Sequence, residues 1–330
     1  MTERSNNYAA FESEISQWMA TGAMGFEEMA MRVFEFQRIA CPEYGRFCTG
    51  RPQPRDWLEI PAVPVEVFRR VALRTFEAER TIRIFRTSGT TGEGFGEHHF
   101  CSLSLYEQSA KLGWVRAGLP MGRVVAIIPT AAECPHSSLS QMASWLTAEG
   151  RFFFGEWERV VGYLGSADRP VLFGTALAFL DFFEWLGPRR LPFPAGSLAV
   201  ETGGYKGSRR EMPKEVLYGL FESKLGIPAD SVWNEYGMTE LSSQFYSRGF
   251  GVHSGPPWCR GRVVDPVSGS EVGEGQTGVL QIFDIANLGS VSAIRTRDLA
   301  IRRGEGFDLL GRDPAALPRG CSRSAEEMLS

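Results

Sequence analysis

Two short stretches of the sequence combine residue types that can bind phosphates and a divalent cation. The stretch 87-TSGTTGEGFG-96 mixes glycines with serine and threonine hydroxyls. Its backbone can curl so that N–H and hydroxyl groups converge on one anion. The stretch 234-NEYGMTE-240 places a tyrosine beside a glycine, and a threonine and a glutamate follow. The ring can lie along a flat base, the hydroxyl can reach a phosphate, and the carboxylate suits Mg²⁺.

Each stretch also has a purely structural interpretation. A run of Ser, Thr and Gly is more often an exposed loop than a phosphate site. Phe95 also stands where a Walker loop needs lysine, so the first stretch is not a Walker loop. In the second stretch, Thr239 can cap a helix whose N-terminus favours the charge of Glu240.

Strands and helices alternate through the middle of the sequence. The expected strands are 81–87, 123–130, 170–175 and 197–204, and the expected helices are 103–118, 138–150 and 176–187. This alternation predicts an α/β fold with a mostly parallel sheet and helices on both faces. Ligands bind at the carboxyl ends of such strands, where we expect 87–96, 202–207 and 234–240 to lie.

The whole chain divides into four expected parts. Residues 1–75 form an N-terminal helical segment, broken near Gly22 and Gly25, followed by an irregular Pro- and Gly-rich arm. Residues 76–258 form the α/β core. Turns dominate residues 259–310, which predicts a small antiparallel β unit, and residues 311–330 form a short C-terminal tail.

Charge and composition exclude several classes of protein. The 330 residues carry a formal net charge of −4, which leaves no basic excess to neutralise the phosphates of a nucleic acid. No apolar run approaches the roughly 18 residues of a membrane span. The six cysteines form no CxxC pair, which favours reduced thiols in the cytoplasm. His98, His99 and Cys101 have no fourth ligand nearby, which disfavours a metal site there.

Five short motifs together resemble those of the adenylate-forming synthetases, enzymes that join a carboxylic acid to AMP. In chain order they are TSGTTG (87–92), TGG (202–204), YGMTE (236–240), TRDL (296–299) and GRD (311–313). A closer resemblance is to one branch, the acyl-protein synthetases of the bacterial luminescence fatty acid reductase system (LuxE-like proteins). The stretches that carry it are 202-TGGYKGSRREM-212, 236-YGMTELSSQFY-246, 284-DIANLGS-290 and 318-PRGCS-322. The resemblance covers residues 60–330 and implies the large-domain fold of these synthetases.

The resemblance implies ATP and Mg²⁺ as cofactors and gives roles to individual residues. Gly203 and Gly204 would line the adenine slot, and Tyr236, beside Gly237, would stack on the base. The residues that would hold the β- and γ-phosphates are Thr87, Ser88, Gly89, Thr90, Thr91 and Gly92.

The resemblance also gives roles to residues around the α-phosphate and the ribose. Thr239 would meet the α-phosphate, and Glu240 would bind the magnesium ion. Asp298 would accept hydrogen bonds from both ribose hydroxyls, and Arg312 would touch the ribose. Without the resemblance, Asp298 is better interpreted as a charge beside Arg295 and Arg297 in a solvated turn. His136 follows a predicted strand and is a candidate border of the carboxylate pocket.

The sequence departs from the synthetase pattern in two places. Related enzymes often carry lysine at the end of the phosphate loop, and 93-EGFGEHH-99 has none. Most also carry a C-terminal domain with a catalytic lysine, which we expect this chain to lack. Either an arginine or Lys206 then takes the place of the missing lysine, or the adenylation step is handicapped.

The sequence therefore predicts an ATP-dependent ligase that converts a carboxylic acid, of the fatty acid class, to an acyl-adenylate. The resemblance at 318-PRGCS-322 implies that the acyl group would pass to Cys321, and Arg319, Arg323 and a capping box at 324–327 would favour its thiolate. The structural alternative is a frayed terminus with an incidental cysteine. By resemblance, the partners would be an acyl-protein reductase and an acyl-transferring thioesterase. Two other functions stay open: acyl transfer to coenzyme A or a carrier protein, and a catalytically weak nucleotide-binding partner subunit.

Overall fold

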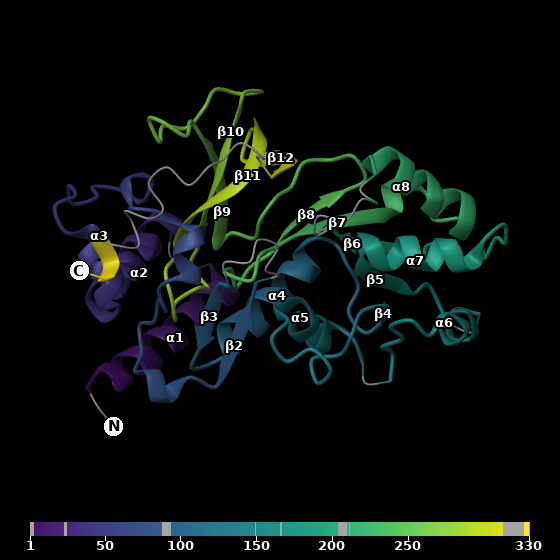
Figure 1. The fold of residues 1–330 in the computed structure, drawn as a ribbon, viewed down its shortest axis with the longest axis horizontal. Helices are drawn as coiled ribbons and strands as arrows, with labels where there is room; N and C mark the ends of the chain where they lie inside the picture. The colour runs from purple at the N-terminus through teal and green to yellow at the C-terminus, as the bar shows by residue number, and fades with distance from the viewer. Residues whose placement is uncertain are drawn as a thin grey trace. The chain divides into compact units, whose positions relative to one another are not determined.

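The fold is known from a computed structural model (Figure 1). It describes residues 3–22, 25–87, 94–148, 150–165, 167–203, 210, 212–312 and 327–329. The chain forms two compact units. The first unit comprises Met1–Ser109, Met238–Gln244 and Ser254–Ser330, and the second unit comprises Ala110–Gly237 and Phe245–His253.

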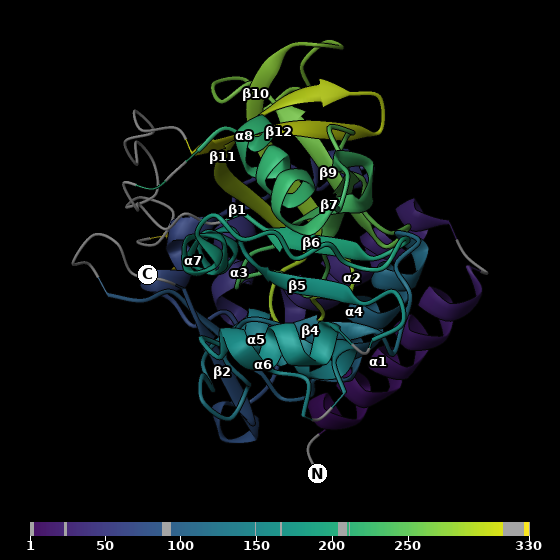
Figure 2. The same cartoon turned by 90° about the vertical axis from the view of Figure 1, so that its right-hand side faces the viewer.

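The second unit is built on a five-stranded sheet. Its strands, in spatial order, are β4 (Val124–Ala126), β5 (Val171–Thr175), β6 (Leu198–Thr202), β7 (Val232–Tyr236) and β8 (Phe245–Arg248). The first four run parallel and β8 runs antiparallel to β7. Figure 2 shows β4, β5 and β6 lying side by side in this order. The inner strands β5 and β6 are buried and rich in apolar residues, as expected of parallel strands covered on both faces.

Helices cover both faces of this sheet, as the sequence predicts. Its helices are α5 (Ser138–Leu146), α6 (Trp157–Leu164), α7 (Ala176–Leu186) and α8 (Lys214–Leu220), with a π-helical turn at Phe221–Leu225 and a 3₁₀ turn at Ala229–Ser231. Leu172 of β5 packs in one cluster with Phe179 and Phe221. The next residue, Phe173, points to the opposite face, where its ring centroid lies 6.0 Å from that of Trp114 in α4 (Ser104–Arg116).

The first unit begins with three helices. They are α1 (Glu3–Thr21), α2 (Phe26–Ala40) and α3 (Pro42–Cys48). The predicted break near Gly22 is confirmed, and Gly22 has a positive φ of 67° just after α1 ends. The prediction of an irregular arm after α2 is wrong at α3, since Pro42 starts a helix that buries Tyr44 and Phe47.

A second five-stranded sheet lies in the first unit. Its members are β1 (Val63–Pro64), β9 (Cys259–Val264), β10 (Thr277–Asp284), β11 (Ala293–Arg303) and β12 (Gly306–Arg312). β1 pairs in parallel with β11, and the other pairs are antiparallel. Three 3₁₀ turns lie near β1 in the sequence. The turn η1 (Trp57–Glu59) precedes β1, and the turns η2 (Val65–Arg69) and η3 (Ala78–Arg80) follow it.

The expected first strand of the parallel sheet belongs instead to a separate hairpin in the first unit. β2 (Arg83–Arg86) pairs antiparallel with β3 (Glu97–Phe100), which sequence analysis did not predict. The partner strand lies only a short loop away, so the local pairing satisfies the backbone of β2 without the parallel sheet. The prediction that 81–87 joins the parallel sheet is therefore wrong.

The last described residues, Glu327–Leu329, form a helical turn against α3 (Figure 1). Arg46 Nε donates to the Met328 carbonyl at 2.6 Å, and Arg51 Nη2 lies 2.9 Å from Glu327 Oε2. The Met328 side chain is fully buried. Within the described part of the chain, none of the helices combines the length and the apolar character that a membrane span requires.

Candidate functional site

Glu240 is a buried carboxyl group in a turn of the first unit. Its residue is only 6% exposed, and burial raises the pKa of its carboxyl to about 7. The positive charges of Arg312 and Arg69 act against this rise, and the negative charge of Asp298 adds to it. The structure therefore brings the predicted metal ligand, Glu240, within electrostatic range of the two predicted ribose contacts.

Asp298 and Arg312 face each other across neighbouring strands. Asp298 of β11 is the register partner of Arg312 of β12, and Arg312 Nε lies 3.8 Å from Asp298 Oδ1. The Asp298 side chain is 13% exposed, whereas that of Arg312 is 72% exposed. Solvent screens a pair with one exposed partner, so this contact adds little stability. Asp298 therefore lies in a strand, and the alternative of a solvated turn is wrong.

Three buried side chains hold the turn that carries Thr239 and Glu240. His98 Nδ1 lies 2.9 Å from the Thr239 carbonyl oxygen, and Asn287 Nδ2 donates to the Glu240 carbonyl at 2.9 Å. Asp284 Oδ2 accepts the backbone N–H of Ser242 at 2.8 Å. We call His98, Asp284 and Asn287 the turn clamp. Removal of one partner of such a buried hydrogen bond leaves the other unsatisfied, which lowers the free energy of unfolding by about 1–3 kcal/mol.

His98 serves this clamp as a neutral ring. Burial lowers the pKa of His98 to about 4, so the ring carries one proton at neutral pH. Because a carbonyl oxygen only accepts, that proton is on Nδ1. Among the described residues there is no group of three or more His, Cys, Asp or Glu side chains placed to hold a metal ion.

Further buried polar groups support Asp284 and Asn287. Ser243 Oγ donates to Asp284 Oδ1 at 2.6 Å, and Ser242 Oγ donates to Asn287 Oδ1 at 3.0 Å. Gln37 of α2 donates to the Asn287 carbonyl at 2.9 Å and accepts the N–H of Ser292 at 2.8 Å. The chain segment 284–292 is thereby tied to α2 and to the turn at the same time.

Thr87 and Gly96 close the base of the predicted phosphate loop. Thr87 N–H donates to the Gly96 carbonyl at 3.0 Å, and Gly96 N–H donates to Thr87 Oγ1 at 2.8 Å. Ser88, Gly89, Thr90, Thr91 and Gly92 lie outside the described residues. The phosphate contacts predicted for them stay predictions.

In the second unit, Tyr236 ends strand β7 between two other rings. Its ring centroid lies 6.2 Å from that of Phe245 and 6.3 Å from that of His253. His253 Nε2 donates to Asn234 Oδ1 at 2.6 Å, since Asn234 uses its Nδ2 to donate to Glu201 Oε1 at 2.6 Å. This buried chain of hydrogen bonds sets the orientation of the His253 ring beside Tyr236.

Two buried carboxyl groups accompany this chain. Burial raises the pKa of Glu201 to about 7, against the charge of Lys214 and the hydrogen bonds it receives. Burial and the nearby Glu201 raise the pKa of Glu235, the residue before Tyr236, to about 8. Both groups therefore hold protons at a pH where an exposed glutamate is ionised.

The remaining predicted site residues are distributed as follows. Gly203 follows β6, Gly237 follows β7, and His136 lies exposed in a turn before α5, all in the second unit. Gly204, Lys206 and Cys321 lie outside the described residues. Sequence analysis missed His98, Asp284 and Asn287 as supports, although 284-DIANLGS-290 was one of the stretches that carried the resemblance.

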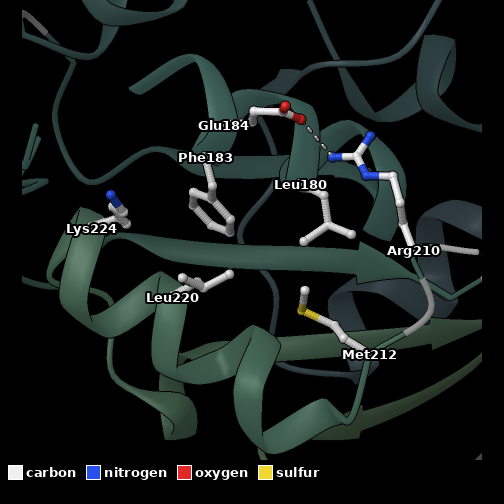
Figure 3. Close-up of a pocket in the computed structure, with 7 residues that line it drawn as sticks. All are labelled: Leu180, Phe183, Glu184, Arg210, Met212, Leu220 and Lys224. Atoms are coloured by element: carbon white, nitrogen blue, oxygen red, sulfur yellow. Dashed lines mark hydrogen bonds and ion pairs between the residues drawn. The ribbon is translucent and has the colours of Figure 1, made fainter. Parts of the chain in front are cut away.

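An open pocket of about 420 Å³ lies elsewhere in the second unit (Figure 3). It is lined by Leu180, Phe183, Glu184, Arg210, Met212, Leu220 and Lys224. Arg210 pairs with Asp181 and with Glu184 at its rim. Among the residues that the structure describes, no predicted site residue lines this pocket.

Comparison with known proteins identifies solved structures that have a similar fold. No protein family matches the sequence, and no curated protein does either. The structure is similar to ATP-bound MatB from Rhodopseudomonas palustris, with a TM-score of 0.52 at 19% identity, over 72% of this chain and 49% of that chain. It is similar to an open conformation of 2-hydroxyisobutyryl-CoA ligase in complex with 2-HIB-AMP and CoA, with a TM-score of 0.63 at 15% identity. That match covers 89% of this chain and 75% of the ligase chain.

These similarities define the class of fold. The chain has the α/β fold of the large domain of adenylate-forming ligases, as predicted. It spans about half the length of MatB. The same 2-hydroxyisobutyryl-CoA ligase in its postadenylation state matches with a TM-score of 0.63 at 14% identity, over 86% of this chain and 66% of that chain.

The raised pKa of Glu235 predicts a pH dependence of stability. Its pKa is about 8 in the folded chain, against an ordinary value of 4.5. Below the pKa of Glu235 in the unfolded chain, both states keep the proton, and the contribution of this group to the free energy of unfolding is complete. As the pH rises from there to the folded pKa, the unfolded chain loses the proton first, and this contribution is lost. The melting temperature should therefore fall between about pH 5 and about pH 8, and Glu235→Gln should make this fall smaller.

A thermal melt at several pH values, followed by circular dichroism, measures this effect. Glu215→Gln is the control, because Glu215 lies exposed on α8 and should leave the pH slope unchanged. Equal pH slopes for Glu235→Gln and the unsubstituted protein would contradict the assignment.

Proposed function

We propose that this protein activates a carboxylic acid, of the fatty acid class, with ATP. One carboxylate oxygen attacks the α-phosphorus, the bond from that phosphorus to the pyrophosphate oxygen breaks, and pyrophosphate leaves. The product is an acyl-adenylate. The observation that carries this proposal is the buried Glu240 on a clamped turn beside Asp298 and Arg312, in a chain with the fold of adenylate-forming ligases.

The residues present fit a magnesium ion at Glu240. The carboxyl is buried, and its pKa is raised despite the charges of Arg312 and Arg69, so a further cation there would favour the ionised form. Hard cations prefer such oxygen ligands. When bound, Mg²⁺ would offset the repulsion between the carboxylate substrate and the phosphates. Glu240 would hold the ion, and Thr239 would contact the α-phosphate.

Two further contacts belong to the proposal. Asp298, mostly buried in the middle of β11, would accept hydrogen bonds from the ribose hydroxyls. Tyr236 would stack on the adenine, and the neighbouring rings of Phe245 and His253 support its orientation. The chemistry is supported by analogy with the structurally similar 2-hydroxyisobutyryl-CoA ligase, whose structure is in complex with 2-HIB-AMP and CoA.

We further propose that the acyl group passes to the thiol of Cys321. The thiolate attacks the acyl carbon, the bond to AMP breaks, and AMP leaves as a thioester forms. Burial raises the pKa of Cys41 to about 12 and of Cys48 to about 11, and it raises the pKa of Cys101 and Cys259 as well. These four thiols are poor nucleophiles at neutral pH, which leaves Cys321 and Cys134 as candidates.

The function predicts a strong effect of Glu240→Gln on ATP–pyrophosphate exchange. The substitution removes the charge but keeps the size and the backbone contacts of the clamped turn. Exchange with a panel of acids should fall about 100-fold, the size of effect seen when one electrostatic contact with a transition state is lost. Glu274→Gln, at an exposed position between β9 and β10, is the control and should keep full exchange. Unchanged exchange in Glu240→Gln would contradict the role of Glu240.

The acyl acceptor is tested by labelling. Incubation with ATP, Mg²⁺ and a radiolabelled acid should leave thioester label on the protein that hydroxylamine removes. Cys321→Ser should abolish this label while exchange survives, and Cys134→Ser should keep it. Label that persists in Cys321→Ser would contradict the assignment, and label that appears only on added coenzyme A or carrier protein would favour those acceptors.

A further inference from the structure

Arg69 lies at the base of the predicted phosphate loop, although it comes from a distant part of the sequence. A Cβ atom built on Gly96 would lie 3.5 Å from Arg69 Cγ and 3.1 Å from Thr87 Cγ2. The stem of Arg69 therefore lies beside Gly96, whose hydrogen bonds with Thr87 join the two ends of the loop. Gly96 leaves the space that this approach needs.

The backbone of Arg69 is fixed to the framework that holds Glu240. Arg69 ends the 3₁₀ turn η2, in which Val67 and Phe68 are buried. The Phe68 ring packs edge-on against His98, with 5.9 Å between ring centroids, and His98 in turn donates to the Thr239 carbonyl. The single contact between Phe68 and His98 thus links the turn that ends at Arg69 to the turn clamp.

A second anchor ties η2 to the sheet of the first unit. Glu66 Oε1 lies 3.5 Å from Arg297 Nε, next to Asp298 on β11. Arg69 is only partly exposed, and its charge is one of two that act on the buried carboxyl of Glu240. Because water is partly excluded here, the positive charge of Arg69 attracts a negative group bound beside Glu240 more strongly than it would in bulk solvent.

We propose that Arg69 binds the phosphates of ATP and the leaving pyrophosphate, in place of the lysine that the loop sequence lacks. This inference rests on the proposed function and adds one catalytic residue to it. The planar guanidinium presents paired donors that match phosphate oxygens, and it keeps its charge at any working pH. Negative charge grows on the pyrophosphate as the bond to the α-phosphorus breaks, and Arg69 stabilises that charge.

Three variants test the role of Arg69. Arg69→Gln removes the positive charge, and Arg69→Lys keeps a positive charge without the paired donors of the guanidinium. Arg70→Gln is the matched control. Arg70 is the next residue, lies exposed, and contributes its backbone N–H rather than its side chain to the end of η2. A thermal melt of each variant checks that the fold is retained.

The first measurement is calorimetric binding of Mg·ATP and of inorganic pyrophosphate, without any acid. Arg69→Gln should weaken both by about tenfold or more, the loss expected for a charge-assisted hydrogen bond, and Arg70→Gln should not. The second measurement is ATP–pyrophosphate exchange. Arg69→Gln should lower kcat/KM for ATP about 100-fold with KM for the acid unchanged, and Arg69→Lys should recover part of the loss.

The outcomes separate this inference from the proposed function. Equal binding and exchange in Arg69→Gln and Arg70→Gln would overturn the role of Arg69, even where the unsubstituted protein exchanges normally. A joint loss of stability, ATP binding and acid binding in Arg69→Gln would also overturn it, because that pattern indicates a structural role. Binding of Mg·ATP that depends on Arg69, without exchange for any acid, would support Arg69 and contradict the proposed function alone.

Discussion

Buried hydrogen bonds from side chains fix the backbone of the Thr239–Glu240 turn, and the candidate site depends on this constraint. The Glu240 carboxyl is buried, so its ionisation is unfavourable without a compensating cation. A mobile turn would relieve that cost by moving the carboxyl into water. His98 and Asn287 hold the two consecutive carbonyl groups of the turn, and this prevents the movement. The site therefore presents a carboxyl group that gains from binding a cation.

The same framework positions the charges around Glu240. Phe68 packs on His98, which places Arg69 at the base of the predicted phosphate loop. The β11–β12 pairing sets Asp298 opposite Arg312. In the second unit, a separate buried chain from Glu201 through Asn234 to His253 supports Tyr236. Buried hydrogen bonds within each unit thus orient its own part of the predicted nucleotide contacts.

Sequence analysis predicted the fold and Glu240, because both leave local signals. Alternating apolar strands and amphipathic helices predict the parallel sheet, and the ordered motifs predict Glu240, Asp298 and Arg312. The supports leave no such signal. His98 and Thr239 are 141 positions apart, and Gln37 and Asn287 are 250 positions apart, so their contacts appear only in the folded chain. The β2–β3 hairpin was missed because β3 contains two histidines and a glutamate, which do not look like a buried strand.

The most direct test of this account is to look for the acyl-adenylate itself. The Cys321→Ser variant, which lacks the proposed acyl acceptor and so keeps the intermediate, is used at a concentration above that of ATP. It is mixed with Mg²⁺ and a panel of carboxylic acids of increasing chain length, and the quenched mixture is analysed by mass spectrometry. The account predicts an acyl-AMP with one or more acids, an equal amount of pyrophosphate, and neither product when Mg²⁺ is chelated. Tight binding of ATP with no acyl-AMP from any acid would contradict it.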